Sequence, residues 1–212
     1  MTDAESAALP STAEIADGIQ ELGFACTDCG ACCRSEEDGD HVATIFPEEI
    51  RRIRDREGTD WRDVARPMPF GLETDGNGET FEWALQVDDC GDCTFFRPAE
   101  TGGKCGIYAD RPLICRTYPF QLAIPGLSSP NAGIVDQAGP VNAYECEGLG
   151  REIDREEAMA LARSLKRRAV EERKQQRRLL DSFEPRPDMD EIVVHDAEGA
   201  KTTDGTPLVD PE

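Results

Sequence analysis

The sequence predicts an α+β fold, in which a small cysteine-rich, metal-stapled domain of short strands and helices is followed by one long C-terminal helix and a flexible tail. Three observations support this prediction. The chain has nine cysteines, and four of them fall within residues 26–33. Short apolar runs separated by glycine, proline and acidic residues fill most of the chain before residue 150. Residues 151–180 form the one long stretch with apolar positions at helical spacing.

The amino-acid composition taken alone is close to that of a disordered chain. The 212 residues carry a net charge of −21, and Leu, Ile, Val and Phe together number 41. Such a chain buries little apolar surface to offset the conformational entropy lost on folding. The cysteines change this expectation, because a metal that binds only the folded chain stabilises it, by on the order of 10 kcal/mol for structural zinc in small peptides.

The negative charge is spread along the chain, and arginine outnumbers lysine 19 to 4. Dispersed carboxylates at this density predict a halophilic, acidic protein that stays hydrated in concentrated salt, where screening removes their mutual repulsion. The same charge argues against nucleic acid or an anionic membrane as the main partner.

The N-terminal sequence predicts a cytoplasmic location. Residues 1–9 have no basic start and no apolar core of a signal peptide, and no apolar run reaches the ~20 residues of a membrane span. In a reducing cytoplasm, closely spaced cysteines are expected to bind metal or to do redox chemistry rather than to form disulfides.

Capping signals mark the first helices. Ser11 and Glu14 form a capping-box pattern, and apolar residues at helical spacing continue to Gly23, so this helix leads the chain to Cys26. Residues 41–46 then favour a strand.

A second helix is predicted from Pro47, a proline at a first helical position, to Gly58, and a one-turn helix near Thr59 carries Trp61. Residues 80–87 favour a strand in which alternate apolar residues share one face, namely Phe81, Trp83, Leu85 and Val87.

A short helix that carries Cys115 is expected after Asp110-Arg111-Pro112, which would cap it, and Pro119 would end it. Residues 121–124 and 134–135 favour further strands between proline- and glycine-rich loops.

The long helical pattern over 151–180 has ten basic and six acidic residues, in contrast to the acidic remainder of the chain. It predicts either a solvated helix docked to an acidic body or a surface for a protein partner. The predicted organisation is therefore an N-terminal extension with a short helix over 1–23, a cysteine-cluster domain over 24–149, the C-terminal helix over 150–183 and an acidic tail over 184–212.

The cysteines carry the predicted chemistry. Cys26, Cys29 and Cys32 have the spacing that begins a bacterial ferredoxin cluster motif, but the next cysteine is the adjacent Cys33 rather than one three residues further on and before proline. Zinc would instead need four thiolates, which two C-x-x-C pairs could supply, as Cys26/Cys29 and Cys90/Cys93 do. Both histidines lie outside the clusters, so the site is predicted to be all-sulfur, with an iron-sulfur cluster favoured over zinc and over a metal-free dithiol.

Eight cysteines sit in paired motifs and are the predicted metal ligands: Cys26, Cys29, Cys32, Cys33, Cys90, Cys93, Cys105 and Cys115. Cys146 stands by itself beside Tyr144 and Glu145 and is expected to be a buried thiol. Arg111 and Arg116 are predicted to lie beside the centre, where guanidinium groups would stabilise a negatively charged cluster and raise its potential; pairing with surface carboxylates is the alternative.

Two motifs resemble a known family. The run from Cys26 to Cys33, followed by Cys105-Gly106-Ile107-Tyr108 and by the segment from Arg111 to Phe120, is similar to the YkgJ-like cysteine-cluster family, the zinc- or iron-chelating CxxCxxCC domain. The resemblance covers about residues 24–147. It implies a small cysteine-rich domain, often an iron-sulfur protein, and a flagellin lysine N-methylase carries a related domain in a longer chain.

Three functions follow as expectations. The first is a metal-binding protein with an iron-sulfur cluster and a redox or accessory role. The second is a zinc-stapled interaction module that recruits a protein through the 151–180 helix, and the third is an accessory of a methyltransferase-like enzyme. The sequence contains no catalytic triad, phosphate loop or dinucleotide fingerprint of an independent enzyme.

Overall fold

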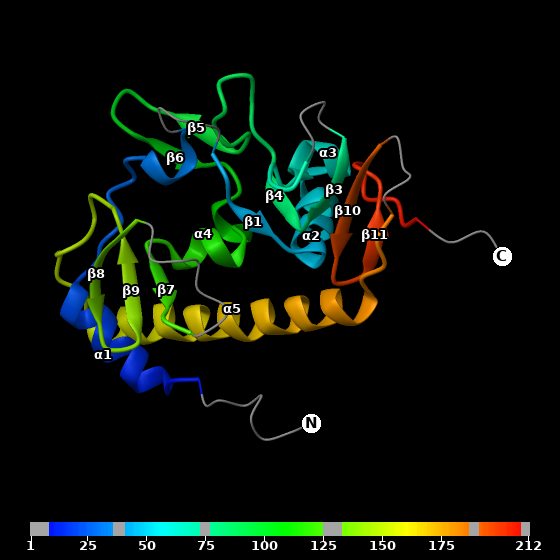
Figure 1. Cartoon of the computed structure of the whole chain (residues 1–212). Coiled ribbons are helices and arrows are strands. Elements are labelled where there is room, and N and C mark those ends of the chain that lie inside the picture. Colours follow the sequence, from blue (N-terminus) through cyan, green and yellow to red (C-terminus); the bar gives the residue numbers. More distant parts are fainter. Residues whose placement is uncertain (1–8, 36–40, 73–76, 125–132, 187–190, 209–212) are drawn as a thin grey trace.

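A computed structural model describes residues 9–35, 41–72, 77–124, 133–186 and 191–208, and it confirms the α+β fold with one long C-terminal helix. That helix, α5 (Arg155–Ser182), runs along the base of the molecule in Figure 1. One end of α5 packs against an N-terminal helix and a three-stranded sheet, and the other end reaches a second sheet near the C-terminus. None of the helices in these ranges is long and apolar enough to cross a membrane.

The first hydrophobic core lies between α5, helix α1 (Thr12–Leu22) and an antiparallel sheet of order β7-β9-β8. Its strands are β7 (Phe120–Leu122), β8 (Ile134–Ala138) and β9 (Val141–Tyr144). The predicted capping box is confirmed, because Ser11 Oγ accepts from the Glu14 N–H and Glu14 Oε2 accepts from the Ser11 N–H. The apolar stripe of α1 is buried against α5, as its helical spacing requires.

The second core surrounds two tryptophans, Trp61 and Trp83, whose rings meet edge to face at 5.1 Å. Helix α2 (Pro47–Glu57) and the one-turn helix α3 (Trp61–Val64) cover a sheet of order β1-β4-β2. Its strands are β1 (Thr44–Ile45), β2 (Ala65–Pro67) and β4 (Trp83–Leu85). The predicted start of α2 at Pro47 and its end at Gly58, which adopts φ +67°, are confirmed.

The continuous strand predicted over 80–87 is wrong. Glu82 adopts φ +67° and divides the segment into β3 (Gly78–Phe81) and β4, which belong to different sheets. The alternation therefore does not place one face inward: Phe81 is 46% exposed, whereas Trp83, Ala84 and Leu85 are all buried. A left-handed backbone at a non-glycine residue has no local sequence signal, so the pattern could not indicate the break.

The flexible tail expected after residue 183 is also wrong for residues 191–208. These form β10 (Ile192–Asp196) and β11 (Gly199–Lys201), in a sheet of order β11-β10-β3 where β10 runs parallel to β3. Val193 and Val194 are fully buried there. The short apolar run in this segment is therefore a core strand, while residues 187–190 and 209–212 lie outside the described part.

A buried ion pair within this C-terminal sheet lies against the second core. Lys201 Nζ lies 2.8 Å from Asp196 Oδ2, and both side chains are almost completely buried. The same carboxylate oxygen accepts from Trp83 Nε1 at 2.8 Å. Lys201 also contacts Glu198, and Arg51 binds Glu198 with two hydrogen bonds that lower the pKa of this carboxyl to about 2, with Lys201 as a further cause.

Candidate metal centre

Backbone contacts bring the first cysteine run to the later cysteines. The run ends in a short 3-10 helix (Ala31–Cys33), and the Cys93 N–H donates to the Cys33 carbonyl oxygen at 2.8 Å. Gly30 precedes this turn with φ +74°, and a Cβ there would lie 2.4 Å from the Phe96 ring. The glycine is therefore needed both for the turn and for the close approach of this ring.

A hairpin places Cys105 next to Phe96. Strand β5 (Phe96–Pro98) pairs with β6 (Gly103–Cys105), so that Phe96 lies opposite Cys105, and the Gly106 N–H donates to the Phe95 carbonyl. This hairpin and the cysteine run lie together above the body of the molecule in Figure 1. Cys93 is part of the second core, and Cys33 and Cys105 pack against it.

Cys115 lies on the short helix α4 (Leu113–Thr117), as the sequence predicts. The N-cap residue is Pro112, within the run Asp110-Arg111-Pro112 expected to cap this helix, but it makes no side-chain capping hydrogen bond. Instead Glu49 of α2 reaches across, and its Oε1 accepts from the Leu113 N–H at 2.9 Å while its Oε2 accepts from the Phe46 N–H. Burial raises the pKa of Glu49 despite these two hydrogen bonds. One buried carboxyl thus fixes α4 to α2.

Four cysteines belong to the second core or pack against it and form what we call the inner group: Cys33, Cys93, Cys105 and Cys115. Burial raises the pKa of Cys93 to about 11 and also raises those of Cys105 and Cys115, and neighbouring cysteines raise all three further. These thiols are therefore neutral at physiological pH when no metal is bound. A cation would replace their protons, which is how metal binding releases protons from cysteine sites.

The adjacent side chains of Cys32 and Cys33 shift each other's pKa. Their interaction raises the pKa of Cys33 and lowers the pKa of Cys32 to about 7, with Arg111 as a further cause for Cys32. Cys32 is exposed and Cys33 is partly buried, so the adjacent side chains face different surroundings. Cys32 is accordingly the cysteine most easily ionised beside the inner group.

Cys146 lies beside the start of the cysteine run. Its pKa is raised first by burial and then by the neighbouring thiols of Cys29, Cys32 and Cys26. Two backbone contacts cause this placement. The Ala25 N–H donates to the Gly148 carbonyl oxygen at 3.0 Å, and Phe24 forms an isolated antiparallel β-bridge with Leu149. We call Cys26, Cys29, Cys32 and Cys146 the outer group.

Glycine permits this approach, because a Cβ at Gly148 would lie 2.4 Å from the Ala25 carbonyl oxygen. Sequence reasoning missed the proximity of Cys146 to the run. The contact joins residues more than a hundred positions apart and depends on backbone packing that no local pattern encodes.

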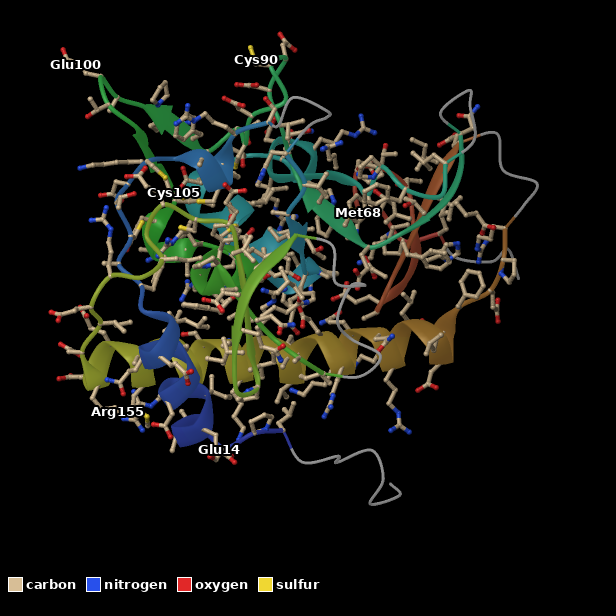
Figure 2. All side chains as sticks on the ribbon, turned by 60° about the vertical axis from the view of Figure 1, so that its left-hand side comes forward. Glu14, Met68, Cys90, Glu100, Cys105 and Arg155 are labelled. Atoms are coloured by element: carbon tan, nitrogen blue, oxygen red, sulfur yellow. The ribbon has the colours of Figure 1, made fainter. Side chains whose placement is uncertain are left out.

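Cys90 lies apart from both groups. It is exposed in a turn where its N–H donates to Asp88 Oδ1. Figure 2 shows it at the tip of a loop, well separated from Cys105. The second C-x-x-C pair therefore places one cysteine in the core and the other in solvent.

The two predicted arginines take different positions. Arg111 stacks on Tyr108 at 3.8 Å and lowers the pKa of Cys32, for which the interaction with Cys33 is the largest cause. Burial raises the pKa of Cys105 and Cys115, and the positive charge of Arg111 opposes this rise. Arg116 instead donates to the carbonyl oxygens of Arg111 and Ala109 and braces the turn that carries Arg111.

The donor set fits zinc or iron chemically, since both metals bind thiolate sulfur. Across the described ranges, no three His, Cys, Asp or Glu side chains converge as the ligands of one ion would. The direction of a cysteine sulfur is set by the single torsion χ1. Forming a metal site therefore requires χ1 rotation of cysteines that are already neighbours.

Comparison with known proteins agrees with this chemistry. No curated protein and no solved structure matches the chain. The family model CxxCxxCC, described as "Putative zinc- or iron-chelating domain", matches residues 25–147 and confirms the resemblance that the two cysteine motifs indicate. Because this match covers more than half of the chain, the protein belongs to the CxxCxxCC family of metal-chelating domains.

Proposed function

We propose that the cysteines hold an iron-sulfur cluster and that the protein has a redox or accessory role in the cytoplasm. The observation that carries the proposal is the inner group, four thiols gathered on one core with the Arg111 charge beside them. A cluster bound by four thiolates carries net negative charge, which a nearby guanidinium stabilises. Exposed Cys32 and Tyr108 place this region near the surface, where an electron partner could approach.

Zinc is the alternative metal, and it would make the same region a stapled interaction module. One observation favours a partner in that case. Helix α5 presents exposed basic side chains at Arg163, Arg167 and Arg178, on a protein whose net charge is −21. This charge contrast supports an acidic protein partner for the 151–180 helix.

The test of metal identity is anaerobic purification of natively expressed protein, followed by metal analysis and visible absorption. We expect iron with acid-labile sulfide and a brown colour. Colourless protein with stoichiometric zinc would establish the alternative. Protein that carries neither metal would remove both proposals.

We further propose two ligand sets, the inner group and the outer group, with Cys146 in place of Cys90. The backbone contacts of Ala25 with Gly148 and of Phe24 with Leu149 place Cys146 beside the first cysteine run, whereas Cys90 is exposed and distant from Cys105. Tetrahedral sulfur sites need four ligands each, and these sets supply four and four.

Single substitutions distinguish the two cysteines. We expect Cys146→Ser and Cys29→Ser each to lower the metal content per chain by a large fraction, because each would remove one of four ligands. Cys90→Ser is the matched control and should keep the metal content of the unmodified protein. Inductively coupled plasma analysis of the three variants measures this directly, and a greater loss in Cys90→Ser than in Cys146→Ser would restore the set expected from sequence spacing.

A further inference from the structure

A polar cavity of about 70 Å³ lies between α2, α4 and α5, on the part of α4 that Glu49 holds. Three guanidinium groups line it, and each comes from a different helix: Arg52, Arg116 and Arg167. Such convergence of arginines is unexpected in a protein with 44 acidic and 23 basic residues. The proposed metal centre does not use this cavity.

Several donors of these arginines are unused within the described ranges. Arg52 Nε is buried and has no hydrogen-bond partner there, although it lies 3.9 Å from Asp110 Oδ1 and Arg52 Nη2 donates to the Asp110 carbonyl oxygen. Arg116 donates through Nε and Nη2 to backbone carbonyls, which leaves its Nη1 hydrogens available. Arg167 is exposed, and no hydrogen bond or ion pair engages it in the described part of the chain. A buried donor without an acceptor costs free energy, which a bound acceptor would recover.

Two of the three carboxylates that line the same cavity accept hydrogen bonds from other groups. Glu49 accepts the N–H groups of Phe46 and Leu113. Glu171 accepts from Gln175 Nε2 with one oxygen and from Lys174 Nζ with the other. Glu48, the third, is exposed and lies near the Arg51 charge. The three carboxylates balance the three guanidinium charges of the lining, and the donors that remain unused in the cavity come from arginine.

We propose that this cavity binds a small oxyanion of the phosphate class. Guanidinium groups bind phosphate oxygens with paired, charge-assisted hydrogen bonds, and three of them from three helices can surround a tetrahedral anion. Bound there, the anion would connect α2, α4 and α5. The proposal is independent of which metal, if any, the cysteines hold.

The experiment is a titration of the full-length protein, as purified with its metal, with inorganic phosphate. Binding is followed by calorimetry at constant ionic strength set with sodium chloride. We expect saturable binding, and we expect Arg167→Gln to weaken it by about tenfold, the effect of losing about 1.4 kcal/mol from a charge-assisted contact. Arg167 is exposed on a helix, so this variant should fold normally.

Arg163→Gln is the matched control, because it removes the same charge from the same exposed helix one turn earlier, outside the cavity lining. It should leave phosphate affinity unchanged. The proposal fails if phosphate shows no saturable binding, or if Arg163→Gln weakens binding as much as Arg167→Gln, since the attraction would then come from the general charge of α5. Metal content, measured on the same samples, reports separately on the cysteine centre.

Discussion

Chelating the metal at low ionic strength is expected to unfold the core that contains both tryptophans, while most of the helical signal survives. Cys93 belongs to that core, and Cys33, Cys105 and Cys115 pack against it, whereas the core between α1 and α5 contains no cysteine. The strands around the thiols are only two or three residues long. Strands so short depend on cross-links for their stability.

Salt should modify the result, because the chain carries a net charge of −21. The Debye length falls from about 10 Å at 0.1 M salt to about 3 Å at 1 M, so concentrated salt screens the repulsion that opposes folding. Either stress alone should therefore unfold less of the protein than both together.

The measurement is tryptophan emission beside circular dichroism at 222 nm, over a grid of salt and chelator. Trp61 and Trp83 are the two tryptophans of the chain, and both are buried in the second core. A red shift in emission should appear before the helical signal falls. Metal-free protein with unchanged emission at low salt would show that the thiols do not hold this core together.

The elements that the sequence predicts well are those whose signals are local. The capping box at Ser11 defines the start of α1, and proline and glycine mark the ends of α2. Helix α5 is long enough for its apolar period to be unambiguous. In each case the residues that determine the element lie within a few turns of one another.

Apart from the local strand break at Glu82, the sequence misses contacts between distant segments. Strand β10 pairs with β3 more than a hundred residues earlier, and its three apolar residues give no sign of a partner. Cys146 reaches the first cysteine run in the same way, through backbone contacts of Gly148 and Leu149. Spacing identified the sulfur chemistry, but tertiary packing decides which thiols are neighbours, as the separation of Cys90 from Cys105 illustrates.

The C-terminal sheet is expected to depend on its buried ion pair. Lys201→Met keeps the apolar stem of the side chain but removes the charge that faces Asp196, and neither side chain of the pair is more than 3% exposed. Breaking a buried pair from one side leaves the other charge uncompensated, at a cost of about 3–5 kcal/mol. Many domains are stable by only about 5–15 kcal/mol, so this single change should lower the unfolding midpoint strongly.

Two further variants make this prediction specific. Lys174→Met removes the same charge from a pair with Glu171 whose lysine is 57% exposed, and it should cost less than about 1 kcal/mol. Adding Asp196→Asn to Lys201→Met should recover part of the loss, because the amide oxygen can still accept from Trp83 Nε1 and no buried charge remains unpaired. Denaturant unfolding monitored by tryptophan emission gives all three free energies. Equal costs for Lys201→Met and Lys174→Met would mean that Asp196 is hydrated in solution and that the sheet does not depend on the pair.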